Sequence, residues 1–150
     1  MRTVEGLDAL KALVGQDLGQ SEWRTITQER IDQFAEVTED RQWIHIDREK
    51  AAKSPLGGTI AHGYLVLSML PAMMAETVTY EGWSAKMNYG LDRLRFTAPV
   101  PAGGRIRANL SLKEVEETST GVRVRMGVTV ELENASKPAC VAETLSLLIP

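Results

Sequence analysis

The chain has 150 residues, of which 43% are hydrophobic and 25% charged, and its formal net charge at pH 7 is -3. This length and composition predict a single domain over residues 1–150 with a hydrophobic core, and they argue against disorder. The acidic balance gives no electrostatic reason to expect binding to nucleic acid or to an anionic membrane. The single cysteine, Cys140, excludes a disulfide within the chain, and the N-terminus lacks the apolar run of a signal peptide, so we expect a cytoplasmic protein.

The first part of the sequence has helical periodicity. Leucines recur at helical spacing over residues 7–14, and residues 21–26 are predicted to form a short strand. Thr27 is a predicted N-cap for a helix that ends near Thr38. Asp47 is predicted to cap one further turn, and a Gly- and Pro-containing loop follows.

Residues 60–78 form the strongest predicted helix. Its apolar residues cover most of the circumference: Ile60, Tyr64, Leu65, Leu67, Met69 and Leu70. A helix that is apolar nearly all round is buried on nearly all sides.

The period changes from 3.6 to 2 in the second half of the sequence. Apolar and polar residues alternate over residues 105–113 and 121–132, and a last strand is predicted over 139–149. A first long strand over 83–97 changes its apolar register near Gly90, which predicts a bulge. The fold class is therefore α+β, with a strongly curved antiparallel sheet wrapped around the apolar helix.

The segment TEDRQWIHID contains the first candidate site. Asp40 and His45 lie five positions apart in a predicted loop. A carboxylate and an imidazole have reference pKa values of about 3.9 and 6.5, which suit proton transfer near neutral pH. Taken alone, an Asp after a helix is more often a turn former and a lone His a hydrogen-bonded bystander. A metal site built from His45, Asp47 and His62 matches no familiar ligand spacing, so no metal is predicted.

The segment GGTIAHGY leads into the apolar helix and contains the second candidate site. The first N–H groups of a helix have no partner inside it, and Gly63 would let a carbonyl oxygen approach its N–H closely. Such a donor stabilises an oxyanion or enolate. Equally, Gly63 could serve only the close packing of a strand on the helix. His62 either faces the site or is a packed structural residue.

Other chemistries find little support. The sequence has no nucleophile elbow, no dinucleotide fingerprint and no P-loop. Four arginines at positions 93, 95, 105 and 107 could bind the phosphates of an acyl carrier. Charged residues on the solvent-exposed face of a sheet are the commoner explanation. Cys140 alternates within a predicted strand and is expected in the core.

The segments FAEVTEDRQWIHID and GGTIAHGYLVLSML together resemble the MaoC-like dehydratases and (R)-specific enoyl-CoA hydratases, in particular the subgroup related to nodulation protein N. The family motif runs from an aromatic residue and Ala to Gly-Asp-x-Asn-Pro-x-His-x-Asp, and a second block, Ile-Ala-His-Gly, opens the central helix. The likeness continues through NYGLDRLRFTAPVPAGGRIRA and so covers most of the chain.

The resemblance implies a hot-dog fold, in which a long central helix is wrapped by a curved antiparallel sheet, and it implies a homodimer. Asp40 matches the catalytic Asp and His45 the catalytic His of the family. Gly63 matches the glycine whose N–H polarises the thioester carbonyl. The implied activity is the reversible hydration of a trans-2-enoyl thioester, without a metal or redox cofactor. Coenzyme A or an acyl-carrier arm is part of the substrate.

Three positions depart from the motif. Glu39 stands where Gly is usual, Gln42 where Asn is usual and Trp43 where Pro is usual. Gln42 keeps an amide that could brace the catalytic pair, and Trp43 adds bulk that could reshape the acyl pocket. These departures motivate one alternative, a non-catalytic acyl-thioester-binding subunit.

A second alternative is a hot-dog thioesterase, which would use a carboxylate on the central helix. Glu76 is a poor candidate for that acid.

Overall fold

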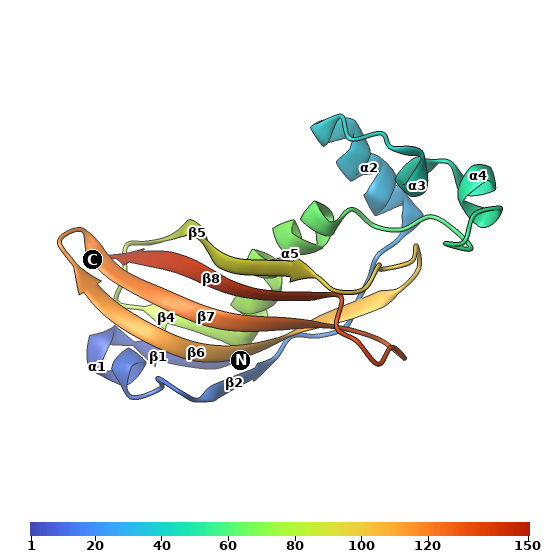
Figure 1. Ribbon diagram of the computed structural model, residues 1–150. Coiled ribbons are helices and arrows are strands. Elements are labelled where there is room, and N and C mark those ends of the chain that lie inside the picture. Colours follow the sequence, from blue (N-terminus) through green and yellow to red (C-terminus); the bar gives the residue numbers. More distant parts are fainter.

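The computed structural model describes residues 1–150, with most of the helices in the first half of the chain and the long strands in the second half, as the sequence periodicity indicates (Figure 1). The helices are α1 (Gly6–Lys11), α2 (Gln28–Thr38), α3 (Trp43–Ile46), α4 (Arg48–Ala52) and α5 (Gly63–Thr77). The strands are β1 (Arg2–Glu5), β2 (Asp17–Gln20), β3 (Arg24–Thr25), β4 (Val78–Glu81), β5 (Ala85–Phe96), β6 (Arg105–Thr118), β7 (Gly121–Leu132) and β8 (Cys140–Ile149).

The main sheet is antiparallel, with strand order β2-β6-β7-β8-β5 and β3 paired to β6. The predicted alternation is confirmed on β6, where Ile106, Ala108, Leu110 and Leu112 are buried and the residues between them are partly exposed. The predicted irregularity in the first long strand is also confirmed, because the register of β5 against β8 shifts on both sides of Gly90. The long strands lie side by side in a curved layer (Figure 1).

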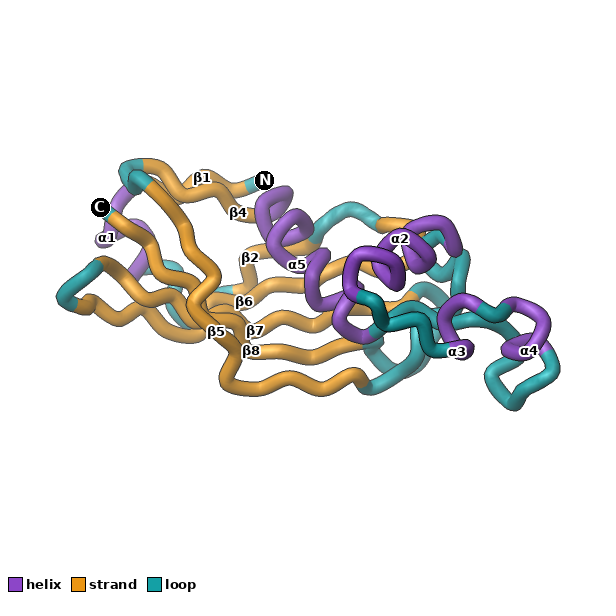
Figure 2. The backbone as a smooth tube through the Cα atoms, turned by 90° about the horizontal axis from the view of Figure 1, so that it is seen from above, coloured by secondary structure: helices purple, strands orange, loops and turns teal.

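The central helix α5 lies against one face of this sheet (Figure 2). Its residues Leu65, Val66, Leu70 and Met73 belong to a cluster of 27 buried residues, most of the others being on the sheet. This arrangement confirms the predicted curved sheet around an apolar helix.

The expectation that α5 is buried on nearly all sides is wrong for the single chain. One stripe remains exposed, made of Tyr64, Ser68, Pro71, Ala72 and Ala75. The sheet covers only the opposite side of the helix, so apolar composition alone overstated its burial.

A two-stranded parallel sheet of β1 and β4 was not predicted. β4 begins at Val78, where the sequence analysis placed the end of the helix, and its β-branched and aromatic residues Val78, Thr79 and Tyr80 favour a strand. The two strands are far apart in the sequence, so no local pattern announces their pairing.

The segment from α2 to α4 stands beyond one end of the sheet, near the start of α5 (Figures 1 and 2). The predicted cap of α2 is confirmed, since the Thr27 side chain accepts a hydrogen bond from the N–H of Arg30. The Asp47 side chain likewise caps α4, accepting from the N–H of Lys50. None of the helices is both long enough and apolar enough to cross a membrane.

Candidate active site

Asp40 emerges from a sharp turn at the end of α2. Glu39 caps that helix with φ 63°, in the left-handed region where glycine is favoured. This conformation turns the chain, so Asp40 leads away from the helix in an exposed loop. A non-glycine residue in this region costs on the order of 1 kcal/mol.

His45 lies within α3, a single helical turn, rather than in the loop that the sequence indicated. Only 6% of its surface is exposed. Its Nδ1 is 2.7 Å from the carbonyl oxygen of Ile60. Because a carbonyl oxygen only accepts, Nδ1 carries the hydrogen, and Nε2 is the nitrogen left free for chemistry.

His62 joins the two predicted catalytic residues. It directly precedes α5 and is 2% exposed, and its Nε2 donates to the backbone carbonyl oxygen of Asp40 at 2.9 Å. Its ring stacks on that of His45, with centroids 3.8 Å apart and planes inclined by 23°. The sequence left open whether His62 faces the site or is packed; in the structure it is packed against both residues of the pair.

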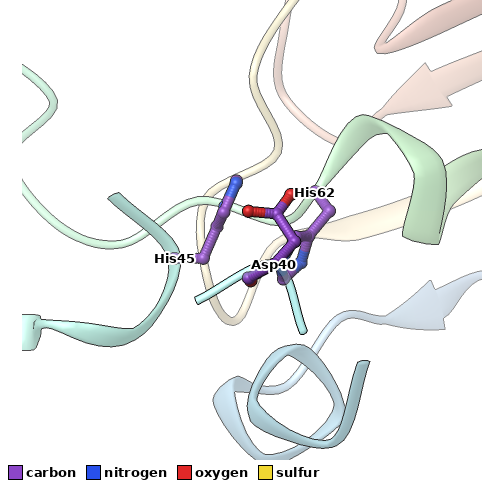
Figure 3. A group of neighbouring side chains, drawn as sticks. All are labelled: Asp40, His45 and His62. Atoms are coloured by element: carbon purple, nitrogen blue, oxygen red, sulfur yellow. The ribbon is translucent and has the colours of Figure 1, made fainter. Parts of the chain in front are cut away.

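Asp40, His45 and His62 form one cluster (Figure 3), in which one carboxylate oxygen and one nitrogen of each ring all lie within 4.8 Å of one another. The Asp40 carboxylate and a His45 ring nitrogen face the same small space. This spacing is also compatible with metal ligands, but the ligand set considered from sequence does not assemble, because Asp47 caps α4.

Burial governs the charge of His45. Desolvation lowers the pKa of His45 below its usual value, and the neighbouring His62 adds to this shift. The hydrogen bond to Ile60 and the charge of Asp40 oppose it without reversing it. The imidazole is therefore neutral at pH 7, with an unprotonated Nε2 that can accept a hydrogen.

A cavity of about 360 Å³ connects His45 with the first residue of α5, Gly63. The N–H of Gly63 has no acceptor within the chain, as expected in the first turn of a helix. The remaining lining is mainly apolar: Ile44, Ile60, Ala61, Val66, Phe96, Thr97, Ala98, Pro99, Val100 and Ala139. A group that binds here thus meets an imidazole on one side and a free backbone donor on another.

Comparisons with known proteins give the family. The model of the MaoC like domain matches residues 9–134. The 3-hydroxyacyl-thioester dehydratase Z of Mycobacterium tuberculosis is 49% identical over 146 residues, which is 97% of each chain. The chain belongs to the MaoC-like family.

Further relatives agree with this assignment. Nodulation protein N of Rhizobium leguminosarum is 44% identical over 138 residues, covering 90% of this chain and 86% of that protein. The R-hydratase PhaJ1 of Pseudomonas aeruginosa superposes with a TM-score of 0.73 at 29% identity, covering 91% of this chain and 81% of that one. The hot-dog fold expected from the sequence is confirmed, as is the nodulation protein N-like subgroup.

The departures from the MaoC-like motif are explained in part by the structure. The left-handed φ at Glu39 accounts for the usual glycine there. Trp43 does not line the cavity; its ring lies under the Lys50 ammonium, 4.7 Å from Nζ. Gln42 is exposed and its side chain makes no hydrogen bond to either residue of the pair.

Gln28 braces His45 in the way expected of Gln42. Its Nε2 donates to the carbonyl oxygen of His45 at 2.8 Å and to Asp32 Oδ1 at 2.8 Å, and its carbonyl oxygen accepts from the Thr59 hydroxyl. Sequence patterns contain no signal for this role, because Gln28 is the first residue of α2 and lies outside the motif, which begins at Phe34.

Two of the four candidate arginines and the single cysteine have structural explanations. Arg105 pairs with Glu133 and Arg107 with Glu131, as expected for charges on the wet face of a sheet. Cys140 is fully buried as predicted, and its burial raises the pKa of the thiol to about 11.

Proposed function

We propose that this MaoC-like chain reversibly adds water to the double bond of a trans-2-enoyl thioester and forms an (R)-3-hydroxyacyl thioester. One observation carries the proposal: Asp40 and a ring nitrogen of His45 face one space, and His45 also lines the cavity that reaches the unpartnered N–H of Gly63. A hydratase needs these three groups, two to handle a water molecule and one to hold the thioester oxygen. The R configuration is carried over from the similar R-hydratase.

The tautomer of His45 supports one order of proton transfers. The water oxygen bonds to the β-carbon while one of its protons passes to the unprotonated Nε2 of His45. The electron pair of the double bond moves toward the thioester carbonyl, whose developing charge the Gly63 N–H stabilises. The α-carbon then takes the proton from Nε2, and Asp40 holds the hydrogen that stays on the new hydroxyl. A neutral His45, whose Nδ1 hydrogen is held by the carbonyl oxygen of Ile60, can deliver a proton from Nε2 only after receiving one there.

The direct test uses the purified protein with crotonyl-CoA. We expect the ultraviolet absorbance of the conjugated enoyl thioester to fall, and a thiol reagent to detect no released coenzyme A. Thiol release would establish a thioesterase instead. Tight binding of enoyl-CoA thioesters without turnover, across chain lengths, would establish an acyl-binding subunit.

The thioesterase alternative has little structural support. Its acid would come from the central helix, and Glu76 is already held there by ion pairing with Arg24 and by a hydrogen bond from the N–H of Glu22 at 3.3 Å. Glu76 does not line the cavity that contains His45.

The proposed reaction needs no metal or redox cofactor from the protein, because the proton transfers and the oxyanion contact complete it. Coenzyme A or an acyl-carrier arm enters as part of the substrate. We place the reaction in the cytoplasm, where a free thiol such as Cys140 stays reduced.

We also propose that the enzyme is a homodimer joined through β5. This strand is the edge of the main sheet and is exposed along nearly all its length, so its outer N–H and C=O groups are unpaired. Met87, Tyr89 and Leu91 on it are 56%, 59% and 40% exposed. The neighbouring exposed stripe of α5 is also largely apolar, and a hollow of about 430 Å³ separates it from β5. An antiparallel copy of the same strand would pair this edge and cover these side chains together.

Light scattering coupled to size-exclusion chromatography should give a molecular mass twice that of one chain. Tyr89→Asp should shift the mass toward that of one chain, because two negative charges would meet across the twofold axis. Val37→Asp is the matched control, since Val37 is 79% exposed on α2, away from β5, and this variant should stay dimeric. A wild-type monomer at micromolar concentration would refute the dimer.

A further inference from the structure

The aromatic ring of Phe96 lies directly against the first residue of the central helix. Phe96 is the last residue of β5, and a Cβ atom built on Gly63 would lie 2.6 Å from the nearest carbon of its ring. Real Cβ atoms do not approach ring carbons this closely, so only glycine allows the contact. No positive φ requires glycine at position 63; the requirement comes from space alone.

Phe96 also forms one wall of the cavity that contains His45. Its ring meets Tyr64 edge to face, with centroids 5.9 Å apart and planes inclined by 76°. The contact with Tyr64 and the contact with Gly63 together fix the ring beside the free N–H at the start of α5. The rest of the ring is open to solvent, since 44% of Phe96 is exposed in the single chain.

The position of this ring relative to the substrate follows from the proposed function. If the thioester carbonyl oxygen accepts from the Gly63 N–H, the carbonyl carbon and the adjoining α-carbon lie next to the residue that Phe96 touches. The α-carbon must also lie within reach of Nε2 of His45, on the same cavity. The flat ring therefore flanks the carbonyl and α-carbons, where a planar enoyl thioester fits and a substituent on the α-carbon does not.

We propose that Phe96 is a specificity-determining residue that restricts the enzyme to thioesters without a branch at the α-carbon. This inference rests on the proposed function only for the placement of the carbonyl at Gly63. Phe96 takes no part in proton transfer; its ring excludes a methyl group at C2 and favours the flat, unbranched acyl group.

The test compares crotonyl-CoA with 2-methyl-2-butenoyl-CoA, which differ by one methyl group at the α-carbon. In Phe96→Ala, the ratio of kcat/KM for the branched over the straight substrate should rise about ten- to two-hundred-fold above the wild-type ratio, the range in which a pocket discriminates one methylene. Phe96→Leu, which keeps apolar volume but removes the ring, should give a smaller rise and guards against a folding defect in the alanine variant.

Val66→Ala is the matched control, because Val66 is buried on α5 and lines the same cavity at another point. If enlargement of the cavity anywhere admits the branch, Val66→Ala will raise the ratio as much as Phe96→Ala, and the inference is wrong. An unchanged ratio in both Phe96 variants also overturns it.

A binding measurement separates this inference from the proposed reaction. Butyryl-CoA and 2-methylbutyryl-CoA cannot be hydrated, and they differ by the same methyl group at the α-carbon. By calorimetry, Phe96→Ala should gain affinity for 2-methylbutyryl-CoA relative to butyryl-CoA by a similar factor, whether or not the wild type hydrates any enoyl thioester. Equal relative affinities in wild type and variant would refute the role of Phe96 even if the hydratase assay succeeds.

Discussion

His45→Ala should lower kcat/KM for crotonyl-CoA hydration by about two to four orders of magnitude, the usual range for removal of a general acid or base. Asp40→Asn should lower it by about ten- to a hundred-fold, the cost of losing one hydrogen bond to a charged group. Asparagine keeps the shape of Asp40, but its neutral amide oxygen holds the hydrogen of the water more weakly than a carboxylate does. Alanine removes the nitrogen that receives the proton from water. Steady-state kinetics at neutral pH measures both effects.

The double variant distinguishes one catalytic unit from two independent groups. Because both side chains act on the same water, Asp40→Asn combined with His45→Ala should cost little more than the worse single change. Asp8→Asn on α1 is a matched control for loss of one surface carboxylate and should retain wild-type kinetics. If either site variant hydrates every enoyl thioester as fast as wild type, the assignment of that residue fails.

The pH profile adds a readout specific to His45. Burial lowers the pKa of His45, so Nε2 stays unprotonated at neutral pH. We therefore expect kcat/KM to decline on the acid side with a midpoint below pH 6.5. The same pKa shift also makes the folded protein less stable as the pH falls. The unfolded chain binds the His45 proton more tightly than the folded one, so this group's contribution declines as pH falls from about 6.5 through the lower folded pKa. An acid limb centred above 6.5 would contradict the neutral tautomer.

The elements that the sequence predicted well are those with strong local signals. Thr27 caps α2 where expected, and the alternation over β6 and β7 needs no knowledge of distant residues. The parallel pairing of β1 with β4 has no such signal, because its two short strands are separated by most of the first half of the chain. The four-residue helix α3 is likewise too short to show a period.

The site shows the same division between local and long-range information. The spacing of Asp40 and His45 and the family motif identified the pair, but not how it is held. Gln28 comes from the preceding helix, and His62 reaches back from the start of α5 to the carbonyl oxygen of Asp40. These contacts depend on how α2, α3 and α5 pack, which no short segment encodes. Phe96 escaped notice for the same reason, since its contact with Gly63 joins a strand end to a helix start.

Gly63→Ala should lower kcat/KM for crotonyl-CoA by about a hundred- to a thousand-fold, the typical cost of losing one oxyanion donor. The N–H itself remains in alanine. However, the added methyl group would lie 2.6 Å from the Phe96 ring, so the ring or the start of α5 must move, and the methyl group would occupy the approach of the carbonyl oxygen. The same clash should lower the melting temperature.

The double variant Gly63→Ala with Phe96→Ala separates the two roles that the sequence left open for this glycine. Removal of the ring relieves the clash, so the melting temperature should return to that of Phe96→Ala under either role. If Gly63 serves only close packing of β5 on α5, activity will return with it. If a substrate carbonyl must approach the Gly63 N–H, the methyl group still stands in the way, and activity will stay low in a protein whose stability has recovered. We expect this second outcome, because the cavity brings the unpartnered N–H to the same space as His45.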